Sequence, residues 1–416
     1  MEIVIAGGGV AGLEGLLAVR RALRDRAHLT LIAPDPDFSY RPLAVAEPFG
    51  LGHAHRVPLT RFAADTGAEL VIDSVAGVDD AARQARLASG DTRSFDALLL
   101  APGGRAVAGV EGATTWWPGG DSESYGGLLR DLEEGYAKRL AIVVPPGAVW
   151  PLPAYELALM TAGEAQEMGQ SDVRITVVTP EHAPLSLFGD QASQAVAAEL
   201  RWAGIELVTG AVARRDGDEL VLEPSGERID VQRVFAVPRI VGPATEGVPI
   251  DDEGFIVADD EARVEGCERT WAAGDGVVSP VKFGGLATHQ ARRGAAAIAR
   301  LGGADADDPG EPVLHGRLLV GHRTRRLVPA RGAQGAPLWW PHGKVAGEHL
   351  PRWLAENGVA PPAAEEPPDE GVTVRRPLSA MRGAEAQYLV DLARQFKTSD
   401  PAIAALGRRM REARER

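Results

Sequence analysis

The fold of this chain is decided by one stretch near its start, Ile3-Val4-Ile5-Ala6-Gly7-Gly8-Gly9-Val10-Ala11-Gly12. Apolar residues typical of a buried strand run into a Gly-x-Gly-x-x-Gly loop, and an amphipathic pattern predicts a helix over residues 10–23. Gly7 permits the tight turn, Gly9 lets the backbone approach a pyrophosphate, and Gly12 brings the helix close to the strand. The start of the helix offers free N–H groups and a positive dipole end to phosphates. The residues expected to contact a dinucleotide here are Gly7, Gly9, Val10, Ala11 and Gly12.

The second strand of this unit is predicted over residues 29–33. A ribose-binding carboxylate is expected at the end of such a strand. Asp35 lies about two positions later than that place, within Pro34-Asp35-Pro36-Asp37. Asp35 is therefore a candidate ribose contact, and a plain turn-forming role stays equally open.

Composition limits the classes of function. The chain has 416 residues and a formal net charge of −14, which argues against nucleic acid as its main partner because phosphates require a basic surface. Its single cysteine, Cys267, excludes an intramolecular disulfide and a multi-thiolate metal site, so we expect no metal. The sequence shows neither a signal peptide nor an apolar run long enough to span a membrane, so we expect a cytoplasmic location.

Strands and helices alternate along most of the chain, which favours parallel sheets in doubly wound domains. We predict an α/β fold with two Rossmann-like dinucleotide-binding domains, the first of them discontinuous, and a C-terminal α+β extension. After the second unit the chain is expected to return to the first through strands at 254–257 and 270–275 and a helix at 286–301. A Gly/Ser/Pro-rich segment, 116–127, is interpreted as a crossing between domains. The predicted boundaries are 1–115 with 236–310, then 116–235, then 311–416.

Three further segments carry a resemblance to a known family. They are Phe95–Gly104 (FDALLLAPGG), Thr270–Asp275 (TWAAGD) and Val281–Ala291 (VKFGGLATHQA). In this order and spacing they resemble the pyridine nucleotide-disulfide oxidoreductase superfamily, over roughly residues 1–310. The nearest branch is that of sulfide:quinone oxidoreductase, flavocytochrome c sulfide dehydrogenase and type II NADH dehydrogenase. The resemblance implies that the cofactor is FAD and that the protein is a flavin-dependent oxidoreductase.

The resemblance also implies site residues. Asp275 would bind the ribityl chain or the pyrophosphate, and Gly284 with Gly285 would face the pyrimidine edge of the flavin. The helix from Leu286 would aim its positive end at N1 and O2, where charge develops in reduced flavin. The remaining expected cofactor contacts are Arg41, Ala101, Pro102, Gly103 and Gly274.

Two departures from the family pattern narrow the function. After the strand at 140–144, where a second glycine loop would bind NAD(P)H, the chain reads Val144-Pro145-Pro146-Gly147-Ala148-Val149-Trp150-Pro151-Leu152-Pro153-Ala154-Tyr155-Glu156. Prolines lack the N–H donors that a pyrophosphate needs, so NAD(P)H binding in the usual manner is not expected. The cysteines of the sulfide-oxidising branch are also missing, and Cys267 is interpreted as an inert thiol.

Side chains that could act at the flavin come from three places. The candidate catalytic residues are Lys282, Tyr40 and His289, and each of them has a packing or solvated role as its alternative. Trp339-Trp340-Pro341, with Lys344, is a candidate aromatic wall, although such a pair is more often core. The basic tail at 401–416 predicts either peripheral contact with the inner membrane face or packing on the body or on a second subunit of a homodimer.

Three functions remain open at this stage. The first is an FAD-dependent oxidoreductase between an unidentified small donor and an acceptor, with a quinone as a candidate. The second is an NAD(P)H dehydrogenase with an atypical nucleotide loop, for which Glu181 occupies the place of an acidic ribose contact. The third is a flavin-binding subunit or sensor that needs a redox partner.

Overall fold

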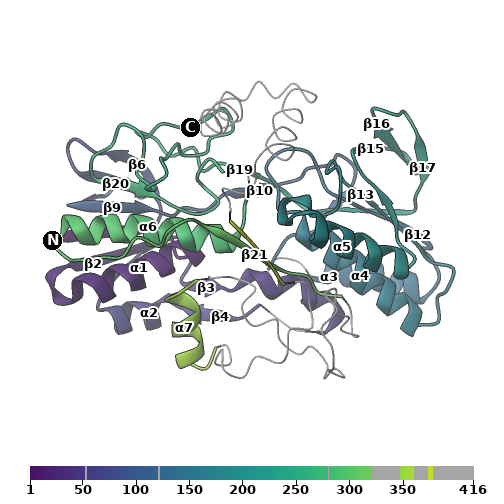
Figure 1. Cartoon of the computed structure of the whole chain (residues 1–416), viewed down its shortest axis with the longest axis horizontal. Coiled ribbons are helices and arrows are strands. Elements are labelled where there is room, and N and C mark those ends of the chain that lie inside the picture. The colour runs from purple at the N-terminus through teal and green to yellow at the C-terminus, as the bar shows by residue number, and fades with distance from the viewer. Residues whose placement is uncertain (52–53, 120–121, 280, 321–346, 360–372, 378–416) are drawn as a thin grey trace.

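The computed structural model describes residues 1–51, 54–119, 122–279, 281–320, 347–359 and 373–377. Figure 1 shows two α/β lobes side by side along the long axis, one containing the N-terminus and the other containing α3, α4 and α5. Each lobe is built on a five-stranded parallel sheet. This arrangement confirms the predicted fold class of two Rossmann-like units.

The sheet of the first lobe has the strand order β20-β9-β1-β2-β5. Its central strand pairs Ile3 with Leu29 on one side and with Ala97 on the other. Helices α1 and α6 pack on one face, and the antiparallel strands β6, β7 and β8 cover the other face. The elements are β1 (Glu2–Ala6), α1 (Val10–Leu23), β2 (His28–Ala33), β5 (Glu69–Ile72), β6 (Val75–Asp79), β7 (Gln84–Leu87), β8 (Thr92–Ser94), β9 (Ala97–Leu100), β20 (Thr270–Ala272) and α6 (Gly284–Leu301).

The sheet of the second lobe has the order β11-β18-β12-β13-β14 and repeats this design. Helices α3, α4 and α5 share one apolar core, and a three-stranded antiparallel sheet packs on the opposite face. In both lobes an antiparallel sheet therefore takes the face that a doubly wound domain would cover with helices. The elements are β11 (Thr114–Thr115), α3 (Ser122–Glu133), β12 (Arg139–Val143), α4 (Leu152–Glu167), β13 (Arg174–Val178), α5 (Asp190–Trp202), β14 (Glu206–Val208), β15 (Val212–Asp216), β16 (Glu219–Glu223), β17 (Arg228–Asp230) and β18 (Arg233–Ala236).

Two local predictions were wrong. The crossing segment contains the start of α3, because Tyr125, Leu128 and Leu132 fall on one helical face and are buried in the second core. Residues 254–257 form no strand; Ile256 makes only isolated bridges, to Ile250 and Val277, after Gly254 has turned the chain with a φ of +82°.

Several elements were not anticipated. A hairpin and two helices follow β2 and close one side of the first lobe: β3 (Asp37–Ser39), the 3-10 helix η2 (Arg41–Phe49), β4 (Arg56–Pro58) and α2 (Leu59–Thr66). A two-stranded antiparallel ribbon, β10 (Arg105–Val107) with β19 (Arg239–Val241), forms between the two crossings from one lobe to the other.

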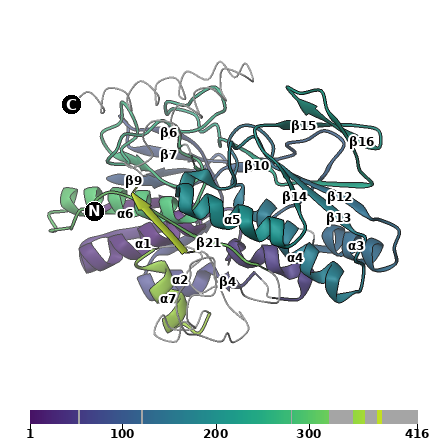
Figure 2. The same ribbon diagram turned by 45° about the vertical axis from the view of Figure 1, so that its right-hand side comes forward.

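The chain beyond residue 310 contributes β21 (Val313–Arg317), α7 (Leu350–Glu356) and β22 (Thr373–Pro377), and β21 pairs antiparallel with β22. Figures 1 and 2 both place α7 beside α1 and α2. Trp339-Trp340-Pro341, Lys344 and the basic tail at 401–416 lie outside the described residues, so their roles, and with them the membrane contact and the homodimer, stay predictions. Among the residues that are described, no helix combines the length and the apolar character needed to cross a membrane.

Candidate cofactor and electron-transfer site

A cleft of about 520 Å³ lies at the carboxyl ends of β1, β9 and β20, between the two lobes. This is the place where parallel α/β sheets bind ligands, because β1 has its sequence neighbour β2 on one side and a strand from farther along the chain on the other. This volume is typical of pockets that bind small molecules and cofactors. A larger and more open groove of about 780 Å³ behind α1 and α6 contains none of the glycine loops.

The first glycine loop has the geometry that a pyrophosphate requires. Gly7 has a φ of +134°, and a Cβ there would lie 1.9 Å from the carbonyl oxygen of Ala101. A Cβ on Gly12 would lie 1.8 Å from the carbonyl oxygen of Gly7, so only glycine lets the helix sit this close to the loop. A Cβ on Gly9 would meet no protein atom within 4 Å, and Gly9 faces the cleft.

Two helix starts converge on this cleft. Gly9 precedes α1 and Phe283 precedes α6, and neither helix has a side-chain cap or an acidic residue in its first turn. Their first N–H groups therefore stay available to an anionic ligand. The turn after β20 lies directly beside α1, since a Cβ on Gly274 would come 3.1 Å from the Cβ of Ala11.

Asp275 and Lys282 are two of the charged residues that line the cleft. Burial raises the pKa of the Asp275 carboxyl, and the positive charges of Lys282 and Arg41 oppose that shift. The buried ammonium of Lys282 donates to the carbonyl oxygen of Val277 at 2.6 Å and lies 3.5 Å from the ring centroid of Phe255. Burial lowers the pKa of Lys282 to about 8. Lys282 therefore stabilises the turn after β20 and also lines the cleft.

The structure brings most of the predicted cofactor residues together. The cleft is lined by all of them except Gly12, Gly285 and Leu286, which lie just behind its wall. Tyr40 packs against Phe38 and does not line the cleft. His289 is buried on α6, outside the cleft, and burial together with the charges of Arg293 and Arg292 lowers its pKa to about 4. The catalytic roles of these residues stay predictions.

Three aromatic side chains line the cleft, and sequence reasoning did not identify them as part of the site. Trp116, Trp150 and Phe283 all line the cleft, and the ring centroids of Trp150 and Phe283 lie 4.9 Å apart. Glu156, from the first turns of α4, also lines the cleft although its residue is 0% exposed, and it accepts a hydrogen bond from the backbone N–H of Leu319 at 2.9 Å. The sequence singled out this stretch only as a degenerate nucleotide loop, and Glu156 was not among the predicted site residues.

The loop before α4, where a second nucleotide would bind, is occupied by contacts with other parts of the protein. Helix α4 begins with Pro151 as its N-cap and with Pro153 in its first turn, so this start lacks donors that a phosphate would need. The backbone N–H of Ile240 donates to the carbonyl oxygen of Ala148 at 2.7 Å, and the side chain of Arg239 packs over Gly147. The predicted loss of a phosphate cradle at this loop agrees with this geometry.

Glu181 does not present a carboxylate for a ribose. It is 7% exposed, and its carboxylate accepts hydrogen bonds from the hydroxyls of Tyr155 and Thr179. Burial raises its pKa to about 7, although these two hydrogen bonds oppose the shift. These contacts hold the side chain inside the second lobe.

This buried carboxyl predicts a pH dependence of stability. Between its ordinary value of 4.5 and about 7, the folded state holds a proton on Glu181 that the unfolded state has lost. The free energy of unfolding should therefore fall as the pH rises through this window and then level off. In Glu181→Gln that decline should be shallower, as measured by urea unfolding at pH 5, 6 and 7; an unchanged slope would contradict the assignment.

Cys267 lies in the core beneath the first sheet and does not line the cleft. Burial and the negative charge of Asp80 raise the pKa of its thiol to about 11, so the reactive thiolate is disfavoured. Within the described ranges no cluster of His, Cys, Asp or Glu is arranged to hold a metal ion.

Comparison with known proteins decides the family, because the sequence profile described as pyridine nucleotide-disulphide oxidoreductase matches residues 1–296. The chain belongs to this family. Its members are FAD-binding flavoprotein oxidoreductases, so FAD is the cofactor, and the glycine loop with its uncapped helix start fits a dinucleotide pyrophosphate. FAD-dependent electron transfer is therefore the class of chemistry.

Relatives within the family differ in substrate. The chain is 28% identical to a sulfide-quinone reductase of Aquifex aeolicus over 189 residues, 43% of each chain. It is 28% identical to an NADH dehydrogenase-like protein of Mycobacterium tuberculosis over 292 residues, 66% of this chain and 72% of that one. Among solved structures, the sulfide:quinone oxidoreductase of Aquifex aeolicus matches with a TM-score of 0.66 at 18% identity, covering 77% of this chain and 81% of that one. A putidaredoxin reductase in complex with putidaredoxin matches with a TM-score of 0.56 at 19% identity, covering 76% and 78%. These structural matches support the fold.

Proposed function

We propose that this flavoprotein passes electrons from a small reduced donor to a quinone, without NAD(P)H and without a cysteine relay. The observation that carries the proposal is the aromatic lining of the cleft by Trp116, Trp150 and Phe283, in a cleft that the buried carboxyl group of Glu156 also lines. Flat aromatic walls suit a planar, uncharged ring such as that of a quinone. The sulfide-quinone reductase relative, whose name contains the same acceptor, supports this choice.

Each part of the cleft has a role in the proposal. The start of α1 and Asp275 bind the cofactor, and the start of α6 offers its uncapped N–H groups to the flavin. Bound FAD supplies the transfer of electrons between donor and acceptor. Reduction of a quinone to a quinol also consumes two protons. In this proposal Glu156, which lines the same cleft, holds one proton at its carboxyl group for the quinone.

The donor is constrained by what the chain lacks. A dithiol route, or a persulfide route through two cysteines, needs a second cysteine, and the whole sequence contains one. A nicotinamide donor would need a phosphate-binding loop at the start of α4, where prolines and the Arg239 side chain lie instead. A small donor that reaches the flavin through the cleft itself meets both constraints.

An anaerobic titration of the purified flavoprotein tests this function. NADH, NADPH and sulfide are added separately while the flavin absorbance is followed, and the fully reduced protein is then mixed with a soluble quinone. We expect slow or no bleaching by NADH and NADPH, and rapid reoxidation by the quinone. Rapid bleaching by NADH would overturn the assignment of the second loop. If the quinone fails to reoxidise the flavin, the assignment of a quinone as electron acceptor is wrong, and a separate redox partner protein is favoured.

A further inference from the structure

A buried carboxylate lies close behind the pyrophosphate loop. Glu14 is on α1, four residues after its first residue, which is about 6 Å along the helix axis at 1.5 Å per residue. The residue is 0% exposed. A buried carboxylate is costly unless hydrogen bonds satisfy it, so its partners show what it does.

The partners of Glu14 come from the other end of the chain. Its carboxylate accepts backbone N–H bonds from Glu348 at 2.8 Å, from His349 at 3.1 Å and from Leu350 at 2.7 Å. These groups lie at the start of α7. Residues 347–359, which we call the C-terminal return, are therefore fastened to α1 through main-chain donors that no substitution at 348–350 other than proline would remove.

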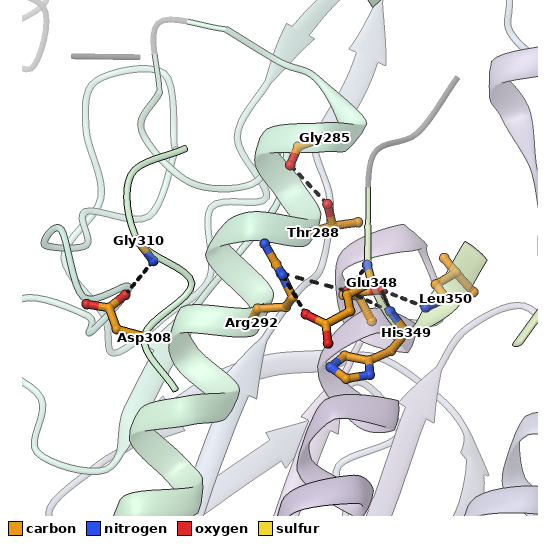
Figure 3. Close-up of polar contacts among 9 residues, drawn as sticks. Gly285, Thr288, Arg292, Asp308, Gly310, Glu348, His349 and Leu350 are labelled. Carbon is orange, nitrogen blue, oxygen red and sulfur yellow. Dashed lines mark hydrogen bonds and ion pairs between the residues drawn. The ribbon is translucent and has the colours of Figure 1, made fainter. Parts of the chain in front are cut away.

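The C-terminal return is also fastened to α6. Arg292 donates to Glu348 at 2.8 Å and lies 4.0 Å from the Glu14 carboxylate. A Cβ on Gly347 would lie 3.2 Å both from the Glu14 carboxylate and from the Thr288 methyl group, so the return passes tightly between the two helices. Thr288 is four residues after the first residue of α6, and its hydroxyl donates to the carbonyl oxygen of Gly285. Figure 3 shows the return lying against α6 and α1 at this level.

A third attachment joins the C-terminal return to α2. The indole ring of Trp353 stacks on Phe62 with centroids 3.7 Å apart, and its N–H donates to Asp65 at 2.8 Å. The return thus holds α1, α2 and α6 together. Two of these helices, α1 and α6, begin at the cofactor cleft. The return contacts them at Glu14 and Thr288, about one helical turn from those starts.

We infer that Glu14 is a positioning residue for the cofactor: it couples docking of the C-terminal return to FAD binding without touching FAD. The attachment fixes α1 against α6, and these two helix starts must both face the same dinucleotide. Coupling of this kind is reciprocal, so FAD must strengthen docking of the return by the same factor by which docking strengthens FAD binding. The inference rests on FAD as the cofactor and is independent of the donor and the acceptor.

The test uses the full-length protein with Glu14→Gln. Glutamine keeps the size of the side chain but removes the charge and turns N–H donors toward the backbone N–H groups at 348–350. Two quantities are measured. One is the dissociation constant of FAD for the apoprotein, from quenching of FAD fluorescence. The other is the hydrogen exchange of the amides at 348–350 with and without FAD. We expect FAD to slow this exchange in the wild type, and the variant to bind FAD at least tenfold more weakly with fast exchange in both states.

Glu356→Gln is the matched control, because Glu356 is an exposed residue of α7, within the C-terminal return, and pairs with Arg352 four residues before it. It should change neither quantity. Wild-type exchange at 348–350 that is the same with and without FAD, or a Glu14→Gln variant with undocked return and unaltered FAD affinity, would overturn the inference. If Glu14→Gln does not fold, Trp353→Phe removes the bond to Asp65 while keeping a ring on Phe62. That variant must then weaken FAD binding and speed exchange at 348–350 together, and a change in one alone would overturn the inference.

Discussion

Gly9→Ala should give a protein that folds normally and binds FAD about 100-fold more weakly, which corresponds to about 2.8 kcal/mol at 1.4 kcal/mol per factor of ten. A Cβ at Gly9 meets no protein atom within 4 Å, and its backbone φ of −89° suits any residue. The new methyl group would project into the cleft instead, where the pyrophosphate must approach the backbone. The expected cost to the apoprotein is the loss of a good N-cap, within about 1 kcal/mol.

Gly12→Ala provides the comparison, because it is the same substitution three residues later. Its Cβ would lie 1.8 Å from the carbonyl oxygen of Gly7, so the backbone itself must move. We expect the free energy of unfolding of this apoprotein to fall by about 1–3 kcal/mol, which is the usual cost of overpacking a core. Urea unfolding of both apoproteins and fluorescence titration with FAD separate the two effects. Wild-type affinity in Gly9→Ala would contradict the placement of the pyrophosphate at this loop.

Glu156→Gln should slow quinone turnover by about 100-fold or more, the range for loss of a positioned proton donor. Glutamine retains a side-chain oxygen that can accept the hydrogen bond from the backbone N–H of Leu319, so this attachment is kept. Stopped-flow measurement of the two half-reactions should show flavin reduction by the donor at the wild-type rate and flavin reoxidation by the quinone slowed.

Glu167→Gln is the control on the same helix, since Glu167 is an exposed residue at the far end of α4. It should leave both half-reactions unchanged. If Glu156→Gln also leaves both unchanged, the buried carboxylate serves only to anchor the backbone at Leu319.

The backbone part of the site was predictable from the sequence, and the side-chain part was not. The helix at 10–23, the strands on either side of it and the glycines of the loop follow from local rules, because the turn and the close approach of α1 depend on neighbours in the chain. Trp116 and Glu156 reach the cleft from the second lobe. No local pattern shows that two lobes will present these side chains to one cavity.

The candidate catalytic residues illustrate the same limit. The residue types of Lys282, Tyr40 and His289 are those that act at flavins, but residue type does not give direction. The Lys282 ammonium contacts a carbonyl oxygen and an aromatic ring, and His289 is buried on α6 and does not line the cleft. The helix α3 was hidden for a related reason: Gly126 and Gly127 look like a linker until the buried face around Tyr125 is seen.

The contact between Glu14 and Leu350 joins residues 336 positions apart. At a synthesis rate of about 5–20 residues per second, Leu350 is therefore added roughly 20 to 70 s after Glu14 of α1. The edge strand β20 of the first sheet is also made late, after the entire second lobe. The N-terminal lobe is thus the first to be translated and the last to be completed, and a chain terminated before residue 348 would lack the backbone N–H groups that donate to the Glu14 carboxylate.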